Sequence, residues 1–409
     1  MGRAGRFAAL LAWLLAACAP HARDEAQALH RDAIVIDTHS DTTPWFEDPE
    51  WRFEERHEEG HEDLPRMREG GLDAQFWSIY MGETPGRGAA IRAAIQRIDA
   101  VHELVRRYPR DLALATSADD IRRAAAEGKI ACLMGVEGGH IIEESLPALR
   151  TYYRLGVRYM TLTHSFHTSW ADSAGINEPL PPVHGGLTAF GKDVVHEMNR
   201  LGMMVDVSHV SDGTFWDVLR VSSAPVIASH SATRAIANHP RNLSDDMLRA
   251  LARNGGVVMI NFYSGYIDAS LVAPLRDLFT SFGPRIAEIR AQHPDDDLAR
   301  MRAMRSLFRG VELPRSDLSV LLDHFDHALE VAGPDHVGIG ADWDGVPSMP
   351  RGMEDVSHLP ALTRGLLERG HSPEVVRKVL GENLLRVMEA VQAASGDGGR
   401  PQEVTWRDE

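Results

Sequence analysis

The stretch that decides the fold is Ile34-Val35-Ile36-Asp37-Thr38-His39-Ser40-Asp41. Its three β-branched residues in a row predict a short buried strand. Alternate residues of an extended chain point to the same side, so His39 and Asp41 project together from the end of this strand. Imidazole nitrogen and carboxylate oxygen are both ligands of zinc. A single His-x-Asp pair also fits a surface or capping pair, so the metal interpretation depends on how the later strands end.

Short apolar runs alternate with longer helical patterns along the chain. The runs with the length and residue types of strands are 34–38, 74–81, 130–136, 159–163, 203–207, 225–229, 257–262 and 337–341. The helical patterns between them include 88–108, 145–155, 188–201, 244–254 and 318–332. This alternation predicts parallel βαβ units, and eight strands predict an α/β fold of the (β/α)8 barrel type. An open doubly wound sheet is the competing fold, but no glycine-rich phosphate-binding fingerprint follows the first strand.

Two long segments interrupt the alternation. Residues 45–68 follow the first strand and are rich in Glu, His and Arg, and residues 266–314 follow the seventh strand. Both are expected at the catalytic face, because the βα loops of a barrel cluster there. We expect one barrel domain over residues 32–395 and a polar C-terminal tail over residues 396–409.

The N-terminal residues have the pattern of a signal peptide. Arg3 and Arg6 precede an apolar run over residues 7–17, which is too short to span a bilayer as a helix. The run ends Leu-Ala-Ala-Cys, as in a bacterial lipoprotein, which predicts a signal peptide over residues 1–17 and a lipid anchor on Cys18. Residues 18–31 would then be a tether; the alternative is a plain secretory signal cut nearby. Cys132 lies in an apolar run and is expected in the core.

Composition excludes one class of partner. The 409 residues include 59 acidic and 43 basic side chains, and the net charge is −16. This balance argues against binding to nucleic acid, because binding to its phosphate backbone requires basic patches. The sequence also contains 20 histidines, so only those at the ends of strands carry weight as candidate ligands.

Later strands also end in ionisable residues. Glu137 ends the third strand and precedes two glycines, which permit a tight turn and a close backbone approach. The fourth, fifth, sixth and eighth strands end near His164, His209, His230 and Asp342. Burying so many ionisable groups on one face of a barrel is unfavourable unless a cation compensates them. A metal centre is therefore the simplest explanation.

These motifs resemble the membrane (renal) dipeptidase family, a zinc-dependent branch of the amidohydrolase barrels. The resemblance covers about residues 33–388. It implies two zinc ions per chain, with His39 and Asp41 at one ion, His209 and His230 at the second, and Glu137 bridging the pair.

The resemblance also implies the residues that bind and cleave the substrate. His164 would contact the substrate near the scissile carbonyl, and Asp342 would handle the proton of the attacking water. Arg241, in the sequence Pro-Arg-Asn, would hold the terminal carboxylate of the substrate with help from Tyr266. Arg241 could instead be a surface arginine ahead of a helix. Asp344 is a rival for the base, but it lies further beyond the strand, so Asp342 is preferred.

The expected function is that of an exported metallodipeptidase. It would hydrolyse dipeptides with a free C-terminal carboxylate, L,D-dipeptides included, by means of a hydroxide shared between the two zinc ions. One alternative is another binuclear amidohydrolase, acting on lactones, phosphotriesters or N-acyl amino acids. A second is a non-catalytic binding lipoprotein on the same barrel. The lipid anchor would be the only contact with the membrane. The protein is expected at the membrane or elsewhere outside the cytoplasm, such as in the periplasm. It could also form a homodimer.

Overall fold

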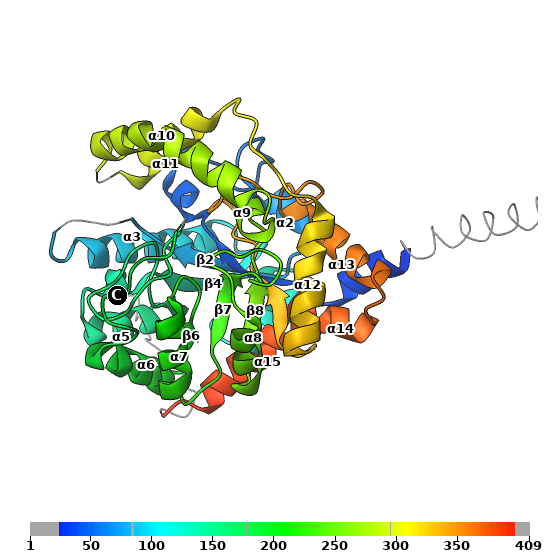
Figure 1. Cartoon of the computed structure of the whole chain (residues 1–409). Helices are drawn as coiled ribbons and strands as arrows, with labels where there is room; N and C mark the ends of the chain where they lie inside the picture. The colour runs from blue at the N-terminus through cyan, green and yellow to red at the C-terminus, as the bar shows by residue number, and fades with distance from the viewer. Residues whose placement is uncertain (1–23, 83–85, 177, 295, 397–409) are drawn as a thin grey trace, which may run out of the picture.

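Eight parallel strands close into a barrel (Figure 1). The computed structural model describes residues 24–82, 86–176, 178–294 and 296–396. The strands of the ring are β1 (Ile36–Ser40), β2 (Ala74–Ile79), β4 (Ile130–Glu137), β5 (Val157–Thr161), β6 (Met204–Asp206), β7 (Ile227–Ser231), β8 (Val257–Ile260) and β9 (Val337–Ile339). Neighbours follow the order β2-β1-β9-β8-β7-β6-β5-β4, and β4 pairs in turn with β2, which closes the ring. The predicted (β/α)8 barrel is confirmed, and each of the eight predicted runs contributes a strand.

One short strand lies outside the ring. β3 (Leu112–Leu114) pairs with the amino-terminal residues of β4, and Leu112 lies opposite Ile130. The sequence did not predict it, because three residues are too few to show an alternation of apolar and polar side chains.

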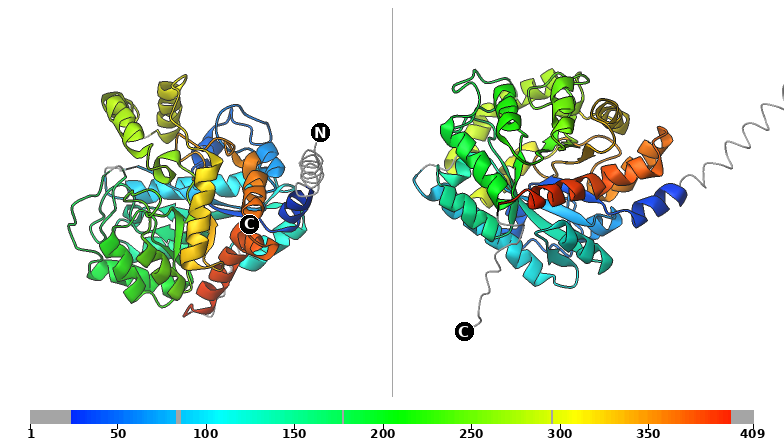
Figure 2. Two further views of the ribbon diagram at one scale, coloured as in Figure 1. Left: turned by 45° about the vertical axis from the view of Figure 1, so that its right-hand side comes forward. Right: turned by 90° about the horizontal axis from the view of Figure 1, so that it is seen from below.

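Helices cover the outside of the barrel (Figures 1 and 2). Their bounds are α2 (Leu64–Glu69), α3 (Ala89–Arg107), α4 (Ala118–Ala126), α5 (Leu146–Arg154), α6 (Ala189–Leu201), α7 (Asp212–Val221), α8 (Asp245–Arg253), α9 (Ser264–Ile267), α10 (Val272–Gln292), α11 (Asp297–Phe308), α12 (Leu318–Ala332), α13 (Leu359–Glu368), α14 (Pro373–Arg377) and α15 (Asn383–Ala393). Short turns of 3-10 helix are η1 (Thr43–Glu47), η2 (Gly139–Ile142) and η3 (Val356–His358), and η4 (Lys378–Glu382) is a π-helical turn. The five predicted helices correspond to α3, α5, α6, α8 and α12. Serine caps such as Ser145 and Ser244 accept a backbone N–H at the first turn, which explains where α5 and α8 begin.

The interior of the barrel is filled by side chains. Every residue of the eight strands is buried, as expected for a parallel sheet covered on both faces. At the amino ends of the strands, α15 contributes Leu384 and Met388 to an apolar cluster that includes Ile36 and Met259. Cys132 lies in β4, and burial raises the pKa of its thiol to about 12, so the prediction of a core cysteine is confirmed.

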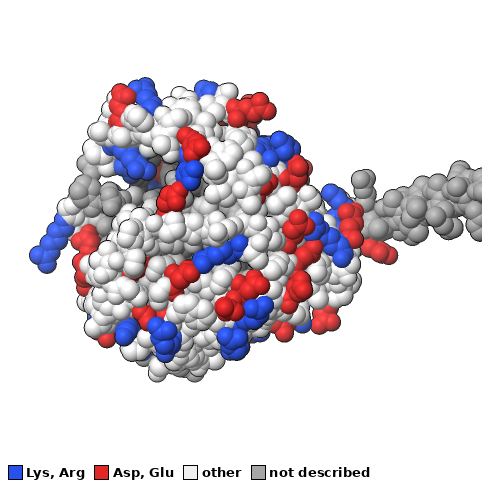
Figure 3. Space-filling model, in the orientation of Figure 1, with Lys and Arg blue, Asp and Glu red and all other residues white. Residues whose placement is uncertain are grey.

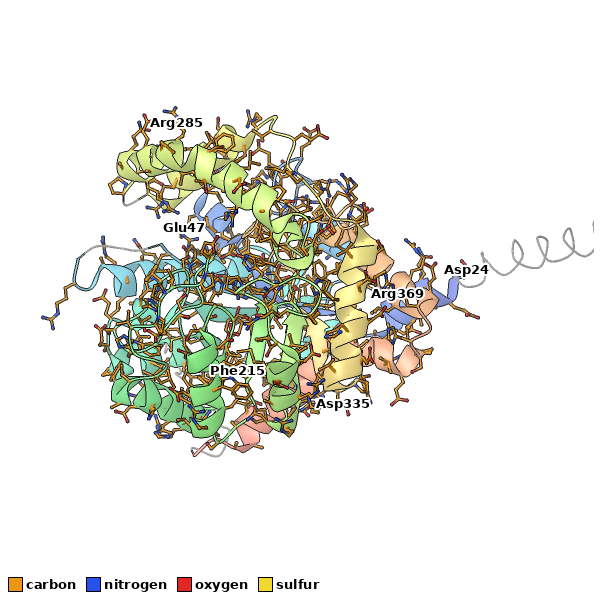
Figure 4. All side chains as sticks on the ribbon, viewed as in Figure 1. Asp24, Glu47, Phe215, Arg285, Asp335 and Arg369 are labelled. Carbon is orange, nitrogen blue, oxygen red and sulfur yellow. The ribbon has the colours of Figure 1, made fainter. Side chains whose placement is uncertain are left out.

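Both inserted segments lie at the carboxyl ends of the strands. The first, after β1, forms η1 and α2, and the second, after β8, forms α9, α10 and α11. Helices α10 and α11 together project above the barrel, and we call this pair the helical arm (Figure 1). Glu47, the last residue of η1, lies beneath the arm, and Arg285 lies on the arm itself (Figure 4).

The described N-terminal residues pack on the barrel. Residues 24–32, most of which belong to the expected tether over residues 18–31, form a helix in which Ala26 and Leu29 are buried. His30 Nδ1 lies 2.7 Å from Thr363 Oγ1.

Residues 1–17, Cys18 and residues 397–409 fall outside the described part of the chain. Among the described helices, none combines the length and the apolar character that crossing a membrane requires. Charges of both signs are interspersed on the face seen in Figure 3.

Candidate metal centre

The carboxyl ends of β1, β4, β6 and β7 bring the five predicted ligands together. Glu137 Oε1 lies 3.3 Å from His39 Nε2, 3.0 Å from His209 Nε2 and 3.3 Å from His230 Nε2. His39 Nε2 in turn lies 3.4 Å from Asp41 Oδ2. The candidate ligands form three overlapping groups, and within each group the ligand atoms lie within 4.8 Å of one another. The groups are His39, Glu137 and His230; Glu137, His164 and His209; and His39, Asp41 and Asp342.

The chemistry of these donors fits a metal centre. Burial holds the pKa of His209 and of His230 well below the usual value, so both imidazoles are neutral and can offer lone pairs. Their Nε2 atoms lie 2.8 Å apart, and His39 Nε2 is buried with no hydrogen-bond partner among the described residues. Burial also raises the pKa of Glu137 to about 7. Converging lone pairs around a buried carboxylate call for a cation, and zinc accepts both nitrogen and oxygen ligands.

The backbone is strained where these side chains leave the strands. His209, Asp342 and Asp344 have φ values of 67°, 68° and 62°, in the left-handed region. This conformation costs an L-residue about 1–2 kcal/mol, and it persists only where surrounding contacts hold it. Strain of this kind concentrates at functional sites, which supports the assignment of the strand ends as the site.

Asp342 lies next to Asp41 at the edge of the cluster. Asn261 Nδ2 donates a hydrogen bond to Asp342 Oδ2 at 2.8 Å, and burial raises the pKa of this carboxyl. A Cβ atom at Gly345 would lie 2.2 Å from Asp41 Oδ2 and 2.3 Å from Asp342 Oδ1. Both carboxylates therefore lie directly against the backbone of Gly345. Asp344, the rival base, belongs to none of the three ligand groups.

The predicted substrate-binding residues lie around the same cluster. Arg241 is 3% exposed, and its Nη2 donates to the carbonyl oxygen of His230 at 3.1 Å. Its Nε and Nη1 have no hydrogen-bond partner among the described residues. The guanidinium carbon lies 5.4 Å from the centre of the Tyr266 ring, and His164 Nε2 lies 3.7 Å from Glu137 Oε1. The site thus combines candidate metal ligands with a buried cation that has free hydrogen-bonding capacity.

Comparison with known proteins decides the family. Residues 23–399 match the family described as membrane dipeptidase, peptidase family M19. The chain belongs to the membrane dipeptidase family. It is therefore a metallopeptidase of the dipeptidase type, and the resemblance drawn from the strand ends is confirmed.

Relatives and solved structures agree with this membership. The dipeptidase is 37% identical to mouse Dipeptidase 3 over 382 residues, which is 91% of this chain and 67% of the relative. The structure of the probable dipeptidase PvdM from Pseudomonas aeruginosa matches with a TM-score of 0.75 and 27% identity, over 92% of this chain and all of that one. A Rhodobacter sphaeroides metallopeptidase, solved with a phosphinate mimic of L-Ala-D-Ala, matches with a TM-score of 0.71 and 27% identity. That match covers 88% of this chain and all of the other.

In this dipeptidase Tyr159 orients the imidazole of His39. The Tyr159 hydroxyl donates to the carbonyl oxygen of Thr38 at 3.0 Å and lies 2.8 Å from His39 Nδ1. A hydroxyl has one hydrogen, so Nδ1 must carry the hydrogen of the second contact, and Nε2 is the ring nitrogen left to bind a metal. The ring has room because residue 135 is glycine: a Cβ at Gly135 would lie 1.9 Å from Tyr159 Cζ.

Ser229 and Asp206 orient His230 in the same way. Ser229 Oγ lies 2.8 Å from His230 Nδ1 and donates to Asp206 Oδ2 at 2.6 Å. The hydrogen of the Nδ1 contact then belongs to the imidazole, and Nε2 is again free to bind a metal. Asp206 Oδ1 accepts the backbone N–H groups of Ser208 and Ser229, which hold the carboxylate in place. Contacts of this kind behind a ligand fix its tautomer and its orientation.

Sequence reasoning missed Tyr159 and Asp206 as functional residues. Tyr159 lies inside a strand, where an aromatic residue is typical of the core. Gly135 was the available signal, because a glycine in an otherwise bulky strand indicates that another group approaches closely. Asp206 lies between Val205 and Val207, and a lone carboxylate between two valines indicates a buried anchor.

We expect Tyr159→Phe to weaken metal retention about 10- to 100-fold, because His39 loses the contact that fixes its tautomer. Competition with a chelator, followed by elemental analysis of the protein, measures this. Tyr152→Phe is the matched control, since Tyr152 is also buried and its hydroxyl donates to Ile141 O at 3.0 Å, away from the metal ligands. Equal metal retention in the two variants would contradict the tautomer assignment.

Proposed function

We propose that this protein hydrolyses the peptide bond of dipeptides that carry a free C-terminal carboxylate. The observation that carries the proposal is the buried guanidinium of Arg241, with two nitrogens that have no partner among the described residues. An unpaired buried cation is unfavourable, and a guanidinium can bind a carboxylate through two parallel hydrogen bonds. Lactones and phosphotriesters would leave Arg241 unpaired. N-acyl amino acids share the carboxylate but lack the free amine, so they serve as comparison substrates.

We propose zinc as the metal, with two ions per chain. The residues that would hold them are His39, Asp41, Glu137, His209 and His230, with the carboxylate of Glu137 shared. When bound, zinc would act as a Lewis acid toward the scissile carbonyl and would lower the pKa of a water molecule. Neutral imidazoles and carboxylates are ligands suited to this ion.

Asp342 is proposed to move the proton. Its Oδ2 accepts a hydrogen bond from Asn261, which leaves Oδ1 beside Asp41. From this position the carboxylate would take the proton of the attacking water and pass it to the leaving amine. Burial raises the pKa of Asp342, which brings its proton affinity nearer to that required of a base and an acid in turn.

His164 is proposed to hold the substrate's carbonyl oxygen. Burial, with Arg241 as the second cause, keeps the pKa of His164 well below the usual value, so its imidazole is neutral. Ser165 Oγ lies 2.6 Å from His164 Nδ1. When the serine donates this hydrogen bond, the hydrogen of the imidazole lies on Nε2, from which it can be donated to the carbonyl oxygen.

We further propose that L,D-dipeptides are among the substrates and that the protein is exported with a lipid anchor on Cys18. The bound phosphinate mimic of L-Ala-D-Ala in the Rhodobacter relative supports the first point. The pattern of arginines, apolar run and cysteine over residues 3–18 supports the second.

Asp342→Asn is expected to lower kcat by about 10²–10⁴-fold, because the amide keeps the shape of the carboxyl and cannot accept the proton. Metal content should stay at the native level, since Asp342 is not among the five proposed ligands. Steady-state kinetics together with elemental analysis check both statements. Near-normal kcat at full metal occupancy would remove Asp342 from the role of base.

Arg241→Ala is expected to lower kcat/KM for a dipeptide by about 30-fold to several thousand-fold, as for the loss of a buried bidentate contact worth about 2–5 kcal/mol. Arg241→Lys should recover only part, because an ammonium cannot reproduce the planar pair of N–H groups. The corresponding dipeptide amide should be a poor substrate of the native enzyme and should lose little more in the variant. If the amide is cleaved as well as the acid, the dipeptidase proposal fails.

Cys18→Ser is expected to abolish incorporation of a labelled fatty acid when the chain is expressed in a bacterial host. The thiol is the only group on which this class of anchor forms, so the variant should also leave the membrane fraction. Activity per molecule should be unchanged, because Cys18 precedes the barrel. A native protein that takes up no label would favour the plain secretory signal.

A further inference from the structure

Three arginines in and directly after α11 attach the helical arm to the mouth of the barrel. Arg302 and Arg305 are three residues apart and share one face of α11, and Arg309 is the residue that follows the helix. The partners of Arg302 and Arg309 are Asp48 and Glu59, both from the segment that follows β1. The partner of Arg305 is Asp344, two residues beyond Asp342.

The Arg305–Asp344 pair is the most buried of the three. Arg305 Nη2 lies 2.7 Å from Asp344 Oδ1, and the two side chains are 26% and 0% exposed. Arg305 also stacks on the ring of Trp45, at 4.6 Å from its centre. In the Arg309–Glu59 pair the side chains are 74% and 51% exposed, and exposed pairs contribute little.

Asp344 joins three further segments of the mouth. Its Oδ2 accepts from Thr42 Oγ1 at 2.7 Å, and its Oδ1 accepts the backbone N–H of His61 at 3.0 Å. The backbone N–H of Asp344 donates to His61 Nδ1 at 2.9 Å, so this imidazole nitrogen carries no hydrogen and His61 is neutral. Arg305 is therefore the charged partner of this buried carboxylate among the described residues. Arg305 and these hydrogen bonds hold the pKa of Asp344 below the usual range, although burial acts in the opposite direction.

The turn that contains Asp344 also contains Asp342 and is hydrogen-bonded to Asp41. The N–H of Gly345 donates to Asp342 O at 3.2 Å, and the N–H of Asp342 donates to His39 O at 3.1 Å. The N–H of Asp41 donates to the carbonyl oxygen of Trp343 at 2.8 Å. Because Asp41 and Asp342 lie directly against Gly345, a small shift of this turn displaces both carboxylates.

We propose that Arg305 is a positioning residue: by pairing with Asp344 it holds the turn over residues 342–345 in the left-handed conformation that places Asp342 and Asp41. The inserted arm thus completes the catalytic site instead of only covering it. The inference rests on the proposed role of Asp342 as the proton carrier. It adds a residue that touches neither the substrate nor the proposed metal ligands.

The test compares Arg305→Gln with Arg302→Gln. Both changes remove one charge from the same face of α11, but only the first removes a partner of the catalytic turn. We expect Arg305→Gln to lower kcat for a dipeptide about 10- to 100-fold with little change in KM, since a displacement of about 1 Å can cost 10²-fold. Arg302→Gln should stay within about twofold of the native enzyme. Arg305→Lys should recover part of the loss, because it restores the charge without the planar group.

Hydrogen–deuterium exchange gives a measurement that does not depend on activity. The amides of residues 342–345 should exchange faster in Arg305→Gln than in Arg302→Gln, with equal metal content in both. Equal loss of kcat in the two variants would overturn the proposal in favour of general docking of the arm. Unchanged exchange and unchanged kcat in Arg305→Gln would also overturn it. If the difference in exchange is found while the native protein cleaves no dipeptide, the proposed function fails and the positioning contact stands.

Discussion

Glu137 Oε1 has four imidazole nitrogens within 3.7 Å, those of His39, His164, His209 and His230, and the rest of the site follows from this contact. A carboxylate can be buried among neutral imidazoles only if positive charge is supplied, by protons or by a metal. Burial holds the pKa values of His209 and His230 well below the usual range, so these two imidazoles add no positive charge. Burial also opposes charge on His39, but Tyr159, Glu137 and Asp41 raise its pKa well above the usual value, so His39 can carry a proton beside Glu137. A divalent cation would supply this charge to all of the ligand atoms at once and would take the place of a proton on His39.

A closed barrel is the architecture that makes this contact possible. The candidate ligands come from the ends of β1, β4, β6 and β7, which are not all neighbours in the ring. In an open sheet their carboxyl ends would be spread along an edge, at about 4.8 Å per strand. Closing the sheet, by pairing β2 with β4, turns that edge into a rim across which side chains from non-adjacent strands meet. The closed barrel therefore determines how many candidate ligand side chains can meet around Glu137.

Strands and candidate ligands could be predicted from the sequence because both depend on local patterns. A β-branched run followed by His or Asp identifies a strand and the side chain at its end, as in residues 34–41. Tyr159 could not be recognised in this way, because its role depends on contacts with Thr38 and His39, which are far away in the sequence. Arg305 depends in the same way on distant residues: Asp344 lies 39 residues away in the sequence, and Trp45 lies in the segment that follows β1. In α11 the spacing of arginines indicates a shared face, but it does not indicate which of them becomes buried.

The same features that make the site reactive also oppose folding. Buried carboxylates at positions 137 and 342, and left-handed backbone at His209, Asp342 and Asp344, each raise the free energy of the folded chain. Hydrogen bonds with Asn261, Tyr159 and Ser229 recover part of this by fixing Asp342, His39 and His230 each in one orientation. A cation that binds the folded chain and not the unfolded one recovers more, because its binding free energy adds to that of folding. Stability and catalysis in this dipeptidase are then linked through the same ligands.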